Sequence, residues 1–207
     1  MRFNGVFQQE NMMLLLAIFG SPRKNGNTDL MMESFLEGAL SASNIEVQKI
    51  YVRDLRISGC QSCGYCDEHG VCVQQDDMQK VYPFFDTAER IVISSPIYFY
   101  GLNGQTKLLV DRSQASYMRK YKRKAEGHAP LTPASRKGFF LGAGATRGKR
   151  LFDCPVLTVR YFCDAIDVEY AGEVCFREID EKGAIRRHPT ALEECKQAGM
   201  AFVSDGS

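Results

Sequence analysis

Four cysteines are concentrated in one short stretch of the chain. Cys60, Cys63, Cys66 and Cys72 lie within SGCQSCGYCDEHGVC and make up half of the eight cysteines among 207 residues. Thiols spaced C-x2-C-x2-C can wrap a tight loop around an inorganic core, and a fourth thiol after C-x5-C can close it, as in compact iron–sulfur sites. The spacing therefore favours an iron–sulfur cluster, held by a four-cysteine loop at residues 58–74.

Zinc is the main alternative for this loop. Structural zinc usually takes two C-x2-C or Cys/His pairs from opposite sides of a longer finger, and His69 offers a further ligand inside the loop. A redox disulfide, or a loop of thiols without metal, is the remaining alternative. The residue pattern indicates that this loop binds a metal or takes part in redox chemistry. It leaves open the choice among an iron–sulfur cluster, zinc, a redox disulfide and thiols without metal.

The other four cysteines stand alone in apolar or helical segments. Single cysteines are among the most buried residue types and usually act as small hydrophobic side chains, so we expect these four in the core. A chain of this length buries a full core without disulfides, which favours a reducing compartment and hence the cytoplasm. They are Cys154, Cys163, Cys175 and Cys195.

Composition and charge narrow the range of partners. The chain is 44% hydrophobic and 25% charged with a formal net charge of +1, so its global electrostatics favour neither nucleic acid nor an anionic membrane. The longest apolar run, residues 12–19, is too short to span a bilayer and is followed by GSPRK instead of a cleavage site. We expect no membrane partner, with residues 1–11 forming an extension before the first strand.

Short apolar runs alternate with helical patterns along the chain. Strands are predicted at residues 12–19, 45–51, 90–95, 137–141 and 168–174, and helices at 28–42, 76–88, 103–119, 150–165 and 189–202. Continuously apolar strands such as RIVISSP indicate a parallel sheet covered on both faces. The pattern predicts an α/β three-layer sandwich with right-handed crossovers, in which residues 120–135 form a basic, proline-containing loop.

In such a fold, ligands bind where the carboxyl ends of the strands meet the loops. The first of these loops, GSPRKNGNT, combines glycines for a tight turn with polar groups at Ser21, Asn25, Asn27 and Thr28, a forked cation at Arg23 and a helix N-terminus. These features predict a site for a monophosphate, although the loop matches neither a Walker A motif nor G-x-G-x-x-G. The alternative is a polar loop in which Thr28 caps the helix.

Two further loops are expected at the same edge of the sheet. The loop SSPIYFYG after the third strand is apolar and aromatic, so a flat ring can stack on it; the alternative is a core or interface segment. The loop LGAGAT after the fourth strand has small residues that let backbone amides approach such a ring. Together the three loops outline a mononucleotide with a planar head. The ring-binding residues are predicted to be Pro96, Ile97, Tyr98, Phe99, Gly101, Ala143, Gly144, Ala145 and Thr146.

The segments GSPRKNGNT and SSPIYFYGLNGQTK and the order of elements resemble the flavodoxin-like NADPH-dependent FMN reductase superfamily, over roughly residues 12–202. The four-cysteine loop resembles the iron–sulfur flavoprotein branch of it. The resemblance implies a single flavodoxin-like domain at residues 12–207, with a five-stranded parallel sheet in 2-1-3-4-5 order.

The same resemblance implies the ligands and the assembly. FMN would have its phosphate at Ser21, Arg23, Asn27 and Thr28 and its isoalloxazine against residues 96–101 and 143–146. A [4Fe-4S] cluster would lie on the four cysteines near a flavin, in a homodimer or homotetramer.

The expected activity is that of an NAD(P)H-dependent, FMN-containing oxidoreductase, which moves electrons between a two-electron donor and one-electron acceptors. The flavin supplies the chemistry, so no catalytic side chain is predicted. One alternative is an electron carrier fed by ferredoxin without pyridine-nucleotide activity, and another is a zinc-stapled binding module. The basic run at residues 119–124, with Tyr117 and Tyr121 interleaved, is a candidate for NAD(P)H phosphates or an acidic partner; the alternative is a solvated helix end.

Overall fold

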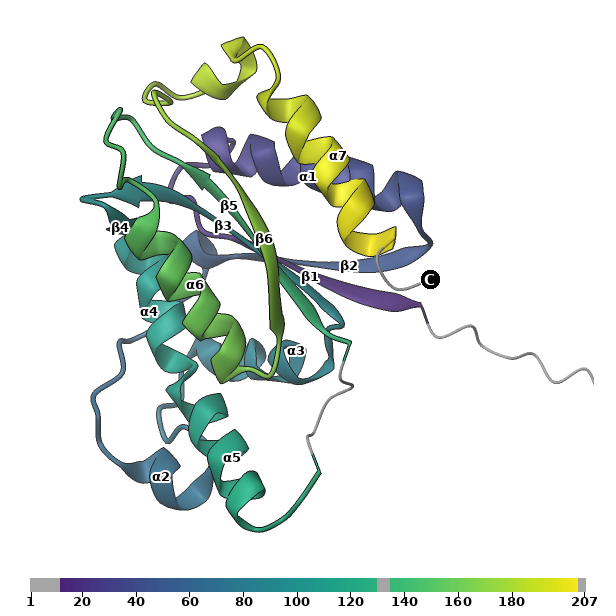
Figure 1. Ribbon diagram of the computed structural model, residues 1–207. Coiled ribbons are helices and arrows are strands. Elements are labelled where there is room, and N and C mark those ends of the chain that lie inside the picture. Colours follow the sequence, from purple (N-terminus) through teal and green to yellow (C-terminus); the bar gives the residue numbers. More distant parts are fainter. Residues whose placement is uncertain (1–11, 130–134, 205–207) are drawn as a thin grey trace, which may run out of the picture.

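The computed structural model describes residues 12–129 and 135–204, so the predicted extension at residues 1–11 lies outside the described residues. In the described ranges, five parallel strands follow the order β2-β1-β3-β5-β6, as predicted (Figure 1). A two-residue strand, β4, pairs antiparallel with the end of β3 and was not predicted. The strands are β1 (Met13–Phe19), β2 (Ile45–Tyr51), β3 (Arg90–Tyr98), β4 (Gly101–Leu102), β5 (Lys137–Ala143) and β6 (Glu169–Phe176).

Helices cover both faces of this sheet, which confirms the three-layer α/β/α sandwich (Figure 1). On β1, the buried side chains of Leu15 and Phe19 face α1 (Asn27–Ala42) and α7 (Ala191–Ser204). Leu16 and Ile18 face the other layer, which contains α3 (Tyr82–Thr87), α4 (Gly104–Arg112) and α6 (Asp153–Ala165). Both faces of β1 are therefore buried, which explains why its sequence is continuously apolar.

The described elements also include three short 3-10 segments and one outlying helix. They are the 3-10 segments η1 (Val52–Asp54), η2 (Asp77–Lys80) and η3 (Ala184–Arg187), and the helix α2 (Tyr65–His69) inside the four-cysteine loop. Gly64 and Gly70 flank α2 in left-handed conformations, with φ of 76° and 66°. Such φ values are accessible to glycine at little cost, so these two positions allow a single helical turn to form between cysteines.

The helices on the α4 side differ from the prediction. The helix expected at residues 103–119 is broken at Ser113, whose hydroxyl donates to the carbonyl of Val110 at 2.7 Å. A second helix, α5 (Gln114–Ala125), continues through residues that were predicted to form a loop, because its Lys, Arg and Tyr side chains are compatible with a helix. The helix expected at residues 76–88 is divided into η2 and α3, and Pro83 lies in the first turn of α3.

The four isolated cysteines are not all in the core. Cys163 and Cys195 are buried as predicted, whereas Cys175 is only partly buried. Cys154 is exposed in the first turn of α6, so the prediction was wrong for that residue. No described helix is both long and apolar enough to cross a bilayer.

Helices α1 and α7 cross with their backbones in contact. A Cβ built on Gly38 of α1 would overlap the carbonyl oxygen of Lys196, and one on Gly199 of α7 would overlap that of Phe35. Both obstacles are backbone atoms, so a side chain at either position would separate the two helices. The packing of α1 against α7 therefore depends on glycine at positions 38 and 199.

We predict that Gly38→Ala lowers the free energy of unfolding by about 1–3 kcal/mol, because overpacking outweighs the roughly 1 kcal/mol that alanine gains in a helix. Urea unfolding followed by circular dichroism measures the change. Gly104→Ala, on the exposed first turn of α4 with nothing within 4 Å of the added Cβ, is the matched control and should be neutral or stabilising. Equal effects of the two substitutions would refute the close crossing.

Candidate functional site

The three predicted ligand loops meet in one cavity at the carboxyl edge of the sheet, with a volume of about 180 Å³. We call it the mononucleotide cavity, after the ligand predicted for these loops. The first loop, the end of β3 and the end of β5 all contribute to its wall. Of the fourteen residues predicted for the mononucleotide, those that line the cavity are Ser21, Arg23, Asn27, Thr28, Pro96, Ile97, Tyr98, Ala143, Gly144 and Ala145.

The first loop presents unpaired polar groups to this cavity. Helix α1 begins directly after Gly26, and no side chain caps its first turn, so the alternative in which Thr28 caps the helix is wrong. Thr28 is buried, and its Oγ1 has no hydrogen-bond partner among the described residues. The Oγ of Ser21 accepts from the N–H of Arg23 at 3.1 Å, which folds the loop back on itself. A buried hydroxyl without a partner costs about 1–3 kcal/mol, so its presence points to a ligand.

The two asparagines of the loop have different roles. Asn27 Nδ2 donates to the carbonyl of Glu181 at 2.8 Å, and its Oδ1 accepts from the N–H of Ile185 at 3.2 Å. Asn27 therefore holds the segment after β6 beside the cavity. Asn25 has a left-handed backbone (φ 56°) and donates its N–H to the carboxylate of Asp29 at 2.9 Å. It lines a neighbouring cavity and not this one.

The aromatic loop is a tight turn between β3 and β4. Phe99 and Tyr100 at its tip have φ of 50° and 64°, values that are unusual for bulky residues and that occur at functional sites. Tyr98 is 44% exposed and Phe99 is fully exposed, so both rings are available to a ligand or a partner. Phe99 and Gly101 do not line the cavity, and neither does Thr146.

A buried asparagine joins two of these loops and was missed by the sequence analysis. Asn103 Nδ2 donates to the carbonyl of Gly20 at 2.7 Å and to Ser95 Oγ at 3.1 Å. Its Oδ1 caps α4 by accepting from the N–H of Thr106 at 3.2 Å. A Cβ on Gly20 would overlap Ser94 O, so that position needs glycine. The available signal was an asparagine at the first position of a predicted helix, where a cap residue is expected.

A fourth wall of the cavity was also missed. Ile179, Asp180 and Lys182 line it from the loop between β6 and η3. The backbone joins this loop to the end of β5, because the N–H of Ile179 donates to the carbonyl of Gly144 at 3.1 Å. The available signal was that a loop after the fifth strand reaches the same edge of a parallel sheet.

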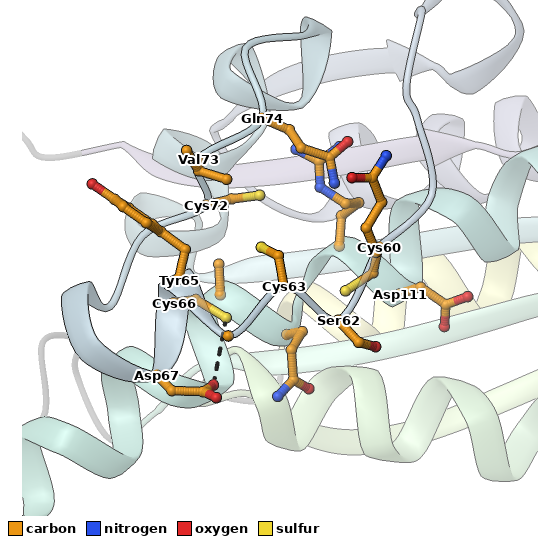
Figure 2. A pocket seen from close by; sticks show the side chains of 15 residues that line it. Cys60, Ser62, Cys63, Tyr65, Cys66, Asp67, Cys72, Val73, Gln74 and Asp111 are labelled. Carbon is orange, nitrogen blue, oxygen red and sulfur yellow. Dashed lines mark hydrogen bonds between the residues drawn. The ribbon is translucent and has the colours of Figure 1, made fainter.

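The four cysteines of the loop line a second cavity, of about 430 Å³ (Figure 2). Figure 2 shows their sulfur atoms turned toward the inside of this cavity. All four thiols are free. Among the described residues, no three Cys, His, Asp or Glu side chains lie close enough together to hold a single metal ion. His69 lies away from the cavity, where its ring contacts that of Tyr65 with centroids 4.1 Å apart.

The cysteines differ in exposure and environment. Cys60 and Cys63 are exposed, whereas Cys66 and Cys72 are partly buried. Burial raises the pKa of the Cys66 thiol, and the nearby Asp67 carboxylate, at 3.8 Å from the sulfur, raises it further. This thiol therefore favours its neutral form until a positive charge, such as a metal, is present.

Polar groups close the neck of the four-cysteine loop. Asp76 Oδ2 accepts from Arg112 Nη1 at 2.7 Å and from the N–H of Ser58 at 2.9 Å. Gln74 Nε2 donates to the carbonyl of Gly59 at 3.1 Å. Burial alone would raise the pKa of Asp76, but the hydrogen bonds from Arg112 and the backbone outweigh burial and hold it below the ordinary value.

The basic run of α5 mainly supports neighbouring elements. Lys122 donates to the carbonyl of Glu68 at 2.6 Å, and Gly70 packs against Arg119, which also forms an ion pair with Asp86. Lys120 contacts carboxylates near the end of α6. The run lies near the amino ends of the strands and contributes no residue to the cavity at their carboxyl ends. In this chain it is not beside the predicted flavin site.

Comparison with known proteins gives a family match over residues 13–145, to the NADPH-dependent FMN reductases. An iron–sulfur flavoprotein of Archaeoglobus fulgidus is 35% identical over 100 residues, which are 48% of this chain and 45% of that protein. One of Methanocaldococcus jannaschii is 35% identical over 126 residues, which are 61% of this chain and 65% of that protein. The aligned part is thus less than two thirds of each relative.

Solved structures agree on the fold. An NAD(P)H:quinone oxidoreductase from Methanothermobacter marburgensis superposes with a TM-score of 0.66 at 14% identity, covering 91% of this chain and 95% of that one. An archaeal flavodoxin superposes with a TM-score of 0.54 at 16% identity, covering 93% and 98%. The family match spans more than half of the chain, and we conclude that the protein belongs to the NADPH-dependent FMN reductase family.

Proposed function

We propose that the protein is an FMN-dependent oxidoreductase of the iron–sulfur flavoprotein type, which accepts a hydride from NAD(P)H and passes electrons on singly. The observation that carries the proposal is that one helix connects the two cavities. Asn103 caps the start of α4 beside the mononucleotide cavity, and Arg112 at its end lines the cysteine cavity. Nine helical residues are about 13 Å long, so the two sites lie close within one chain.

The mononucleotide cavity fits the phosphate end of FMN. Thr28 Oγ1, the uncapped first turn of α1 and the guanidinium of Arg23 supply the donors that a phosphate dianion requires. The volume of about 180 Å³ is below the roughly 300–1,000 Å³ of a complete ligand site, so the ring would extend over the exposed turn at Tyr98. A Cβ on Gly144 would lie 2.8 Å from Leu151 Cδ2, so packing against that side chain favours glycine in this wall of the cavity.

The four-cysteine cavity fits a [4Fe-4S] cluster. Four free thiols line one space of about 430 Å³. A cubane distributes four thiolates over four irons, and the compact spacing of these cysteines is typical of such a cluster, whereas structural zinc usually takes two separate pairs of ligands. Cys60, Cys63, Cys66 and Cys72 would hold it, and it would supply one-electron storage.

The protein's own residues bind and orient these groups. Bound FMN supplies exchange between two-electron and one-electron steps, so the chain needs no acid–base side chain at the ring. Residues 12–207 would act as one FMN-binding domain, in a reducing compartment such as the cytoplasm. Leu157 and Tyr161 on α6 are 55% and 69% exposed, which supports a homodimer or homotetramer.

The location of the basic run favours a second candidate function. Because Arg119, Lys120 and Lys122 contact other parts of this chain, they are not available beside the flavin for nucleotide phosphates. An electron carrier fed by ferredoxin needs no such cations. This carrier would use the same FMN and cluster without pyridine-nucleotide activity.

The phosphate assignment predicts that Arg23→Ala weakens FMN binding by roughly 10- to 150-fold, because a charge-assisted hydrogen bond is worth about 1.5–3 kcal/mol. Fluorescence titration of the apoprotein with FMN measures the dissociation constant. Lys24→Ala removes a neighbouring cation that lines the adjacent cavity instead, so its FMN affinity should stay close to wild type. Equal losses in both variants, or recovery of FAD as the bound flavin, would contradict the assignment.

The cluster assignment predicts about four irons and four acid-labile sulfides per chain after anaerobic purification. Cys60→Ser, Cys63→Ser, Cys66→Ser and Cys72→Ser should each lower the iron content while FMN remains bound, since the two cavities share no residue. Cys154→Ser, at an exposed cysteine outside the loop, should keep the full iron content. Stoichiometric zinc without sulfide would instead support the zinc-stapled binding module.

The choice between enzyme and carrier is decided by the electron donor. We expect NADH or NADPH to bleach the flavin absorbance in anaerobic stopped-flow mixing. Variants of the four loop cysteines should keep this step and lose one-electron transfer to an external acceptor, because hydride transfer to FMN does not need the cluster. Rapid reduction by reduced ferredoxin, with no reduction by either nucleotide, would establish the carrier.

A further inference from the structure

We propose that Arg112 is a positioning residue for the four-cysteine site, which donates N–H groups into the cavity and raises the reduction potential of the cluster held there. The proposal rests on the cluster of the proposed function. Arg112 lies 40 positions after Cys72, the last cysteine of the motif, and no sequence pattern identifies it as part of the site.

The guanidinium of Arg112 is only partly used within the protein. The side chain is 1% exposed. Its Nη1 donates to the carbonyl of Ser58 at 2.9 Å and to Asp76 Oδ2 at 2.7 Å. Its Nε and Nη2 are buried and have no hydrogen-bond partner among the described residues. A charged donor that is buried without an acceptor is costly, and the cost is removed when an acceptor occupies the adjacent space.

The adjacent space is the cysteine cavity. Arg112 lines this cavity together with all four cysteines. The hydroxyl of Tyr82 donates to the Arg112 carbonyl at 2.9 Å, which fixes the backbone from which the side chain extends. The acceptors that suit the free donors there are sulfur atoms.

The sign of the effect follows from the charge. Reduction adds one electron to the cluster, so a fixed positive charge and N–H bonds to sulfur stabilise the reduced form and raise the potential. Asp76 neutralises part of the charge on the Nη1 side, whereas the Nε and Nη2 donors have no acceptor among the described residues. Lysine has a single ammonium group and cannot serve Ser58, Asp76 and the cavity with the same fork.

A purely structural role is the competing explanation, because Arg112 also closes the neck of the loop. Asp76→Asn is the matched control. It weakens the same neck contact and leaves the arginine in place, with its charge less neutralised. A structural role predicts that the Arg112 variants lose iron or keep the wild-type potential, whereas a role in setting the potential predicts a lower potential for the Arg112 variants than for Asp76→Asn.

The test is an anaerobic redox titration of the cluster, followed by electron paramagnetic resonance, on holoprotein whose iron and sulfide have been assayed. Arg112→Gln should lower the ratio of reduced to oxidised cluster at a fixed potential about tenfold, which corresponds to a negative shift of about 59 mV for one electron. Arg112→Lys should shift the potential less, in the same direction. Asp76→Asn should leave it unchanged or raise it. The flavin potential should be unaffected in all three, since Arg112 does not line the mononucleotide cavity.

The possible results distinguish an error in the role of Arg112 from an error in the cluster assignment on which that role rests. Wild-type protein without iron and sulfide would refute the cluster itself. An iron-containing Arg112→Gln protein with the wild-type potential would overturn the proposal. If that variant loses its iron, Arg112→Lys must have a lower potential than Asp76→Asn, and equal or higher values overturn the proposal. Loss of iron from both Arg112 variants, with retention in Asp76→Asn, would leave Arg112 with a structural role only.

Discussion

The buried ion pair between Arg112 and Asp76 determines where the four-cysteine loop can lie. Desolvating two charges is expensive, so such a pair adds little net stability, but removing one partner leaves the other buried and uncompensated. Both partners also bond to the loop, since Arg112 holds the carbonyl of Ser58 and Asp76 accepts its N–H. The neck is therefore fixed, while Cys60 and Cys63 remain exposed.

Helix α4 connects the neck of the four-cysteine loop to the mononucleotide cavity. Its N-cap, Asn103, holds the carbonyl of Gly20 and the hydroxyl of Ser95, and so joins the phosphate loop to the end of β3. Its last residue is Arg112. A helix is stiff over two and a half turns, so the distance between the mononucleotide cavity and the cysteine cavity is fixed by the number of residues in α4. Ser113 ends the helix at this point and lets α5 turn toward α2.

The two helical layers and the convergence of three loops were predictable because they depend on local patterns, whereas the strand order was implied by the family resemblance. Apolar strands, a polar loop before a helix and a compact cysteine motif can each be read within about fifteen residues. Asn103 and Arg112 were missed as site residues because their roles depend on partners far away in sequence. The basic run was only a candidate for nucleotide phosphates or an acidic partner, because its carboxylate partners, such as Asp86 and Asp167, cannot be found without the fold. The binding roles of the predicted residues remain predictions.

The loop before α1 and the four-cysteine loop are each held by an arginine–carboxylate ion pair. Ionisation of the two carboxyl groups changes the stability of the fold in opposite directions as the pH rises. Beside the phosphate loop, Arg53 donates to Asp29 at 2.9 Å and to the carbonyl of Ser21 at 3.1 Å. Burial raises the pKa of Asp29 and outweighs the attraction of Arg53, and one carboxylate oxygen has no partner among the described residues. The pKa of Asp76 is held low by its donors.

Ionisation of these two carboxyl groups therefore affects stability with opposite signs. The contribution of Asp76 is present above the unfolded value of about 3.9 and is lost as the pH falls through the lower folded value. Because the pKa of Asp29 is raised in the folded protein, its contribution instead decreases as the pH rises from about 3.9 through that higher value. On acidification, Asp29 thus becomes neutral before Asp76. The loop before α1 loses its adjacent negative charge while the neck of the four-cysteine loop is still ion-paired.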